Sequence, residues 1–143
     1  MKIIETEQYR DNLGEAFARL IPQLSPTARI PGRENIERMI ADTGTHLLTA
    51  VDEKSDEIVG ILTLVIYDIP TARRAWIEDV VVDTAYRGEH IGLALVDKAI
   101  EIARKYRADQ IILTSNPRRT AARSLYRKCG FVEVETTLFR LKL

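Results

Sequence analysis

Apolar positions recur with helical spacing in some segments of the chain and form short β-branched runs in others. Helices are predicted at 6–21, 33–41, 89–105 and 117–129. Strands are predicted at 2–5, 46–51, 58–69, 75–83 and 110–114, with one or two more within 131–143. Pro22 and Gly130 are expected to end helices, whereas 52–56 and 70–74 are expected turns.

The order of these elements is β-α-α-β-β-β-α-β-α-β-β. It predicts an α/β fold with a mixed central sheet of about six to seven strands flanked by four helices. Hairpin turns between the early strands predict antiparallel pairing, whereas the strand, helix and strand across 75–114 predict one parallel pair with a right-handed crossover. Residues 1–143 have the length of one domain, and an apolar content of 45% suffices for one core.

The charge balance and the rarity of cysteine and histidine argue against several classes of function. Basic and acidic residues both number 21, so nothing favours nucleic acid as the main partner. The lone Cys129 cannot form an internal disulfide and is expected to pack on a helix face. His46 and His90 lack neighbours at metal-binding spacing. No apolar run reaches the roughly 18 residues of a membrane span, so a cytoplasmic protein without a membrane partner is expected.

A glycine-bearing loop, Arg87–Gly92, follows the strand at 75–83 and leads directly into the longest predicted helix. Glycine lets the backbone approach a ligand closely, and the free N–H groups of a helix N-terminus attract anions. Arg87 adds a positive charge. The loop therefore suits a phosphate group, although two glycines alone are equally compatible with a turn that merely starts a helix.

A second motif comprises Thr114-Ser115-Asn116-Pro117, Ala121-Ala122 and Leu125-Tyr126-Arg127-Lys128-Cys129-Gly130-Phe131. In order and spacing, the loop and this motif resemble the two signatures of the GCN5-related N-acetyltransferases, the GNAT superfamily. The family loop has Arg or Gln, then Gly three residues later, then Gly or Ala two residues further on. Here those positions are Arg87, His90 and Gly92, so the middle glycine is replaced. If the backbone there requires a positive φ, we expect weaker CoA binding.

The resemblance implies that acetyl-CoA is the co-substrate and that its acetyl group passes to a primary amine of a small molecule or peptide. The cofactor contacts that it implies come from Val80, Val81, Val82, Arg87, Gly88, Glu89, His90, Ile91, Gly92, Asn116, Ala122 and Tyr126. The three valines are also core strand residues by composition. Asn116 suits helix capping before Pro117 equally well.

Amine attack on a thioester calls for a base, because an amine with a pKa of about 10.4 is almost wholly protonated at pH 7. Glu78 and Asp79 are adjacent on a predicted strand and should point to opposite faces, so at most one is expected to reach the acetyl group directly. Glu78 is the preferred catalytic base; Asp79, or a structural role for both, is the alternative. Tyr126 is the candidate acid for the CoA thiolate, against simple packing on its helix.

Two classes of function stay open. One is a direct-transfer acetyltransferase that works in a ternary complex; the other is a non-catalytic CoA-binding sensor domain, which the substituted loop glycine would favour. An acceptor pocket is expected from the first two helices, 24–32 and 70–74, and its arginines suggest a polar acceptor with a carboxylate or phosphate. Residues 76–79 resemble amino-sugar phosphate acetyltransferases of the same superfamily. The last predicted strand, 138–143, can pair across a homodimer.

Overall fold

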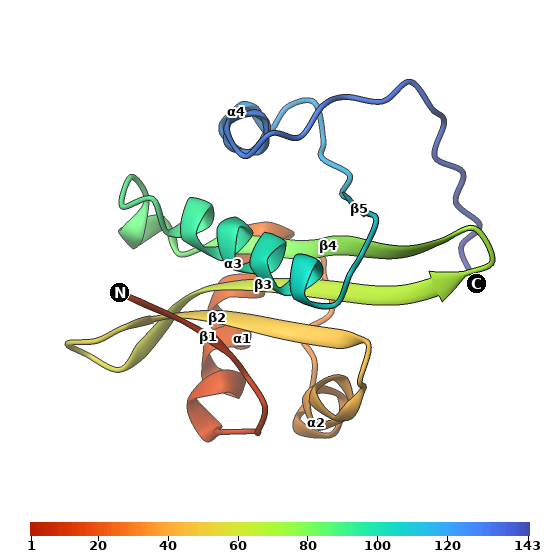
Figure 1. The fold of residues 1–143 in the computed structure, drawn as a ribbon. Helices are drawn as coiled ribbons and strands as arrows, with labels where there is room; N and C mark the ends of the chain where they lie inside the picture. The colour runs from red at the N-terminus through yellow and green to blue at the C-terminus, as the bar shows by residue number, and fades with distance from the viewer.

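A mixed five-stranded sheet runs through the computed structural model, which describes residues 1–143 (Figure 1). Its strands, in spatial as well as chain order, are β1 (Lys2–Glu5), β2 (Thr45–Asp52), β3 (Glu57–Ile69), β4 (Ala72–Val82) and β5 (Gln110–Ile112). The helices are α1 (Asp11–Leu24), α2 (Arg33–Ala41), α3 (Ile91–Lys105) and α4 (Thr120–Lys128), and a 3₁₀ turn, η1 (Thr84–Tyr86), precedes α3. The first four strands are antiparallel and β4 pairs with β5 in parallel, as predicted.

The two faces of the sheet carry separate apolar cores because successive side chains of a strand alternate between faces. Leu48 and Ala50 of β2 belong to the cluster under α3, which lies along one face (Figure 1). Leu47 of the same strand belongs to the cluster that α1 and α2 cover on the other face. Gly60 of β3 allows α3 to approach closely, since a Cβ there would lie 3.2 Å from Leu95 Cδ1. None of the helices has both the length and the apolar character needed to cross a bilayer.

The expected terminal strands are absent, so the prediction of six to seven strands was wrong. Glu133 accepts hydrogen bonds from Arg123 and Arg127, which holds the chain after Phe131 against α4 rather than beside β5. The large apolar residues after Phe131 are 70–111% exposed, namely Val132, Val134, Leu138, Phe139, Leu141 and Leu143. Figure 1 shows this last segment leaving α4 and returning toward the β3–β4 turn without joining the sheet.

Several boundaries also differ from the prediction. Helix α1 continues past Pro22 to Leu24; the carbonyl that loses its N–H partner there belongs to Ala18, which is exposed to water. Helix α4 begins at Thr120 rather than at Pro117, because Asn116 Oδ1 accepts the Arg118 N–H and turns the chain first. Strand β5 ends at Ile112, and β4 begins at Ala72, so the turn after β3 is shorter than expected.

Candidate functional site

Strand β5 is paired along its whole length, but only with the N-terminal half of β4. Their last paired residues are Trp76 and Ile112, and β4 then continues to Val82 without a neighbour on that side. A bulge adds to the irregularity: Thr63 pairs with Glu78 and Ile61 with Val81, so two residues of β4 oppose one of β3. Asp79, within the bulge, has a φ of 49°. Backbone groups of β4 are therefore turned away from the ladder at the place where the sheet opens.

A cavity of about 390 Å³ occupies this opening. Its walls come from α1 and the loop after it, from β3 and β4, from the chain after β5, and from α4. Glu78 and Tyr126, the two candidate catalytic residues, both line it. A second cavity of about 380 Å³ adjoins it and shares Glu78 and Thr114, while Trp76 lines it with its indole N–H donating to Tyr67 Oη at 2.7 Å. The structure thus brings Glu78 and Tyr126, which are 48 positions apart in the chain, to one cavity.

Glu78 has the electrostatic surroundings of a stronger base than an ordinary carboxylate. Much of the residue stays exposed to solvent, yet the cavity walls displace water and raise the pKa of its carboxyl, and the negative charge of Asp79 raises it further. Asp79 lines the same cavity, contrary to the expectation that adjacent strand residues face opposite ways. Its left-handed backbone breaks the strand alternation and accounts for the difference.

Tyr126 reaches the cavity from α4 and is 7% exposed. Burial raises the pKa of its phenol, whereas the nearby Arg119 guanidinium lowers it. The helix end fixes its position: Gly130, with a φ of 92°, lets the Phe131 N–H reach Tyr126 O at 3.0 Å, and the two rings meet edge to face with centroids 6.0 Å apart. The packing of Tyr126 is therefore compatible with the predicted acid role.

The glycine-bearing loop ends at the N-terminus of α3. Gly88 has a φ of 87° and His90 a φ of 58°, so the histidine holds the positive φ that a glycine adopts more easily. His90 caps α3 with its backbone alone, which leaves the N–H groups of the first turn without side-chain partners. A Cβ on Gly92 would lie 3.2 Å from Leu125 Cδ2, so this glycine permits close packing against α4. Uncapped donors at a helix start fit the pyrophosphate of acetyl-CoA.

The remaining predicted cofactor residues are distributed unevenly around the site. Val80 lines the main cavity, and Val81 is buried in the core under α1. Val82, Ile91 and Ala122 pack in or against the core under α3. Arg87 and Glu89 are exposed on the loop, and Asn116 is exposed with its Oδ1 committed to the turn before α4.

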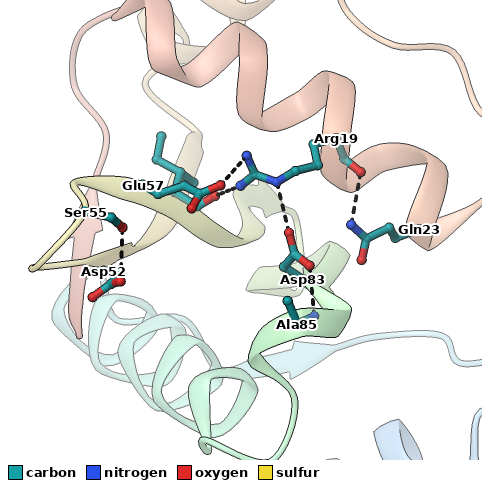
Figure 2. A network of polar contacts seen from close by, with 8 residues as sticks. Arg19, Gln23, Asp52, Ser55, Glu57, Asp83 and Ala85 are labelled. Carbon is teal, nitrogen blue, oxygen red and sulfur yellow. Dashed lines mark hydrogen bonds and ion pairs between the residues drawn. The ribbon is translucent and has the colours of Figure 1, made fainter.

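Two arginines of the site were not singled out as such by the sequence. Arg119, which directly precedes α4, lines the main cavity and donates from Nη2 to Val80 O at 3.5 Å. Arg19 of α1 bonds to Asp83 at the end of β4, with Gln23 close by, as Figure 2 shows. For Arg19, the sequence showed only a cation beside the apolar stripe of a helix. Such a residue is usually a solvent-exposed charge.

Comparison with known proteins places these features in a family. Residues 9–131 match the model of the acetyltransferase (GNAT) family. The chain belongs to this family. Among curated relatives of this GNAT protein, glucosamine 6-phosphate N-acetyltransferase 1 of Oryza sativa subsp. japonica is 30% identical over 129 residues, which cover 85% of the chain and 76% of the rice protein.

Solved structures share the fold of the GNAT protein over nearly its whole length. A transcriptional regulator from Bacillus halodurans C-125 has a TM-score of 0.84 at 25% identity and 99% coverage of both chains. The glucosamine-6-phosphate N-acetyltransferase from Arabidopsis thaliana has a TM-score of 0.81 at 20% identity, with 98% of this chain and 97% of the plant chain covered. GNAT acetyltransferases use acetyl-CoA as co-substrate.

Proposed function

We propose that this GNAT protein transfers the acetyl group of acetyl-CoA to a primary amine by direct transfer, with both substrates bound together. The observation that carries the proposal is that Glu78 and Tyr126 line one cavity beside the open end of β4. A proton acceptor and a proton donor on different elements, with an anion-binding helix end continuing the same strand, meet the needs of amine acylation. Acetyl-CoA supplies the thioester carbonyl that the amine attacks.

The protein contributes binding and orientation first. The free N–H groups at the start of α3 and the exposed Arg87 side chain hold phosphate oxygens of the cofactor. Backbone groups of the bulged β4 segment at Asp79 and Val80, which the ladder with β3 leaves irregular, are available to the arm of the cofactor. Fixing both reactants in one cavity lowers the entropic part of the barrier.

Glu78 acts as the base for the amine. Removing a proton from an amine with a pKa of about 10.4 costs roughly 4–5 kcal/mol at pH 7. Because the cavity walls and Asp79 raise the pKa of Glu78, its carboxylate holds a proton more firmly than an exposed one would. The proton passes to Glu78 directly or through one water.

Tyr126 donates a proton to the departing thiolate. A phenol with a pKa of about 10 is a weaker acid than a thiol of about 8.5, and burial raises the pKa of Tyr126 further. Its contribution therefore comes from its fixed position in the cavity and from the hydrogen bond it offers to the sulfur as charge develops there.

The first test measures thiol release from acetyl-CoA over a panel of amines. Glu78→Gln is expected to lower kcat and to remove the acidic limb of the pH–rate profile, which is displaced to higher pH than for an ordinary carboxyl because the pKa of Glu78 is raised. Glu101→Gln, at an exposed carboxylate on α3, is the matched control. A profile that Glu78→Gln leaves unchanged would remove Glu78 from the mechanism. Acetyl-CoA binding without thiol release on any amine would instead support the sensor.

Tyr126→Phe tests the acid in the same assay. We expect a lower kcat with little change in the acetyl-CoA KM, because the hydroxyl acts on the leaving group rather than on binding. Tyr106→Phe serves as the control, at a tyrosine that follows α3 and contacts the His46 ring in a tilted arrangement, with centroids 4.8 Å apart. An unaltered kcat in Tyr126→Phe would leave this residue with a packing role only.

For the acceptor we propose an amino sugar phosphate. The rice relative is named for glucosamine 6-phosphate, and Arg29, in the loop after α1, lines the main cavity. The other arginines that suggested an anionic acceptor are engaged elsewhere, Arg33 with Glu37 and Arg73 with Asp68. Arg29 is thus the member of that set placed to meet a phosphate.

The acceptor proposal is tested with a pair of substrates. Arg29→Met is expected to raise the KM for glucosamine 6-phosphate by about tenfold, since a charge-assisted contact is lost, and to leave the weak reaction with glucosamine unchanged. Arg33→Met provides the comparison on α2. Equal effects on both sugars would show that Arg29 does not meet the phosphate, and no turnover of either sugar would exclude this acceptor class.

A further inference from the structure

The junction between β4 and the cofactor loop contains a buried carboxylate. Asp83 follows β4 directly, and its residue is 7% exposed. One carboxylate oxygen accepts the Ala85 N–H at 3.0 Å and so caps η1, while the other accepts Arg19 Nε–H at 2.9 Å. Its own backbone N–H donates to Val59 O at 2.8 Å. Asp83 therefore fixes the direction in which the chain leaves the sheet.

Arg19 of α1 binds this carboxylate directly. Its guanidinium also donates from Nη2 to Ile58 O at 2.5 Å and pairs through Nη1 with Glu57 Oε1 at 2.7 Å, as Figure 2 shows. One planar side chain of α1 thus joins the start of β3 to the end of β4. Only arginine offers several donors in such a fixed arrangement.

Gln23 extends the same contact by one helical turn. Its Oε1 accepts the Thr84 N–H at 2.9 Å, and its Nε2 donates back to Arg19 O at 3.2 Å. Helix α1 therefore binds two consecutive residues, Asp83 and Thr84, from which the loop to α3 departs. We refer to Arg19, Gln23, Asp83 and Thr84 as the α1 latch.

The same helix also forms a wall of the main cavity, through Phe17, Ile21 and Leu24. Side chains on α1 at 17 and 21 face the cavity, and those at 19 and 23 face the loop. Helix α1 therefore contacts both the main cavity and the loop that leads to α3. Neither Arg19 nor Gln23 lines the cavity, so neither is placed to touch a substrate there.

We infer that Arg19 and Gln23 are positioning residues for CoA: the α1 latch holds the loop so that the N–H groups at the start of α3 face the pyrophosphate. The inference rests on the proposed function, because it assumes that the loop binds CoA. Without the latch, the loop of 84–90 would lose the bonds from Arg19 and Gln23 that hold its first residues against α1. CoA would then bind only to the fraction of molecules in which the loop is correctly formed.

The test uses Arg19→Met, which keeps an unbranched chain and removes the guanidinium. Isothermal titration calorimetry, well below the melting temperature of each variant, is expected to show the CoA Kd raised by about tenfold. Arg19→Lys should recover part of the affinity, because one ammonium can reach Asp83 but cannot bridge three acceptors. Gln23→Met, which removes the bonds to Thr84 N–H and Arg19 O but leaves the pair between Arg19 and Asp83, should raise Kd several-fold. Arg104→Met, at an exposed arginine in the last turn of α3, is the control and should leave Kd unchanged.

Hydrogen exchange separates positioning from general stability. In Arg19→Met without ligand, the amides of 84–92 should exchange faster than in the wild type, while those of β2 keep their rates. A lower melting temperature with unchanged loop exchange and unchanged Kd would mean that the latch is only structural and would overturn the inference. A wild-type protein that binds no CoA would instead overturn the proposed function; the exchange rates of 84–92 would still decide whether the latch orders the loop.

Discussion

His90, the residue before α3, holds a left-handed backbone conformation. Its φ of 58° lies in the left-handed region, where a side chain costs about 1–2 kcal/mol relative to an ordinary conformation. The sequence showed that a glycine had been replaced at this position. It did not show the sign of φ, because that depends on how the loop is tied at both ends.

We predict that His90→Gly binds acetyl-CoA as tightly as the wild type or more tightly, and unfolds at a higher temperature. Relief of the left-handed strain outweighs the extra freedom that glycine gives to the unfolded chain, for a net gain of about 1 kcal/mol. Calorimetry and thermal unfolding measure the two quantities. Glu89→Gly, at a neighbour without a positive φ, should destabilise the protein. A large loss of affinity in His90→Gly would show that the imidazole itself contributes to binding.

The residues of the candidate site were predictable to the extent that they lie in local motifs. Glu78 and Tyr126 were chosen from two separate segments, and the structure places both on one cavity. The partners of Arg19 could not be found in this way, since Asp83 is 64 positions away and the contact exists only after α1 has packed on the sheet. The inclusion of Asp79 in the cavity likewise depended on a bulge that no local pattern indicated.

At the scale of elements, the end of α4 determines where Tyr126 lies. The Gly130 N–H bonds to Arg127 O at 3.0 Å and the Phe131 N–H to Tyr126 O at the same distance, a pattern that needs the positive φ of Gly130. The glycine was recognisable in the sequence as a helix stop. The start of α4 was not: Pro117 was expected to open the helix, but Asn116 forms a separate turn with Arg118 and the helix begins at Thr120.

We predict that Gly130→Ala lowers the free energy of unfolding by about 1 kcal/mol, since alanine pays for the left-handed conformation. Chemical denaturation of both proteins measures the difference in the free energy of unfolding. Gly14→Ala is the matched control: this glycine is inside α1, where alanine favours the helix, and the added Cβ would meet only the flexible Tyr9 hydroxyl at 3.0 Å. Equal destabilisation by both substitutions would contradict the role assigned to Gly130.

Across the whole molecule, the order of elements and the mixture of antiparallel and parallel pairing could be predicted, because hairpin turns and a strand–helix–strand segment leave clear local patterns. The number of strands could not. Residues 131–143 have β-branched and apolar residues suited to strands, yet Glu133 is bound by α4, and the neighbouring strand β5 is only three residues long. Strand propensity is realised only where a partner edge is within reach.

The α1 latch also has a consequence for the order in which the chain can fold. Its two contacts join residues 61 and 64 positions apart, so their closure carries the entropic cost of a long loop. Contacts of this kind form after the hairpins, whose partners are near in sequence. Helix α1 can therefore order residues 84–90 only once β3 and β4 lie side by side. We expect this segment to be among the last parts of the protein to reach its final form.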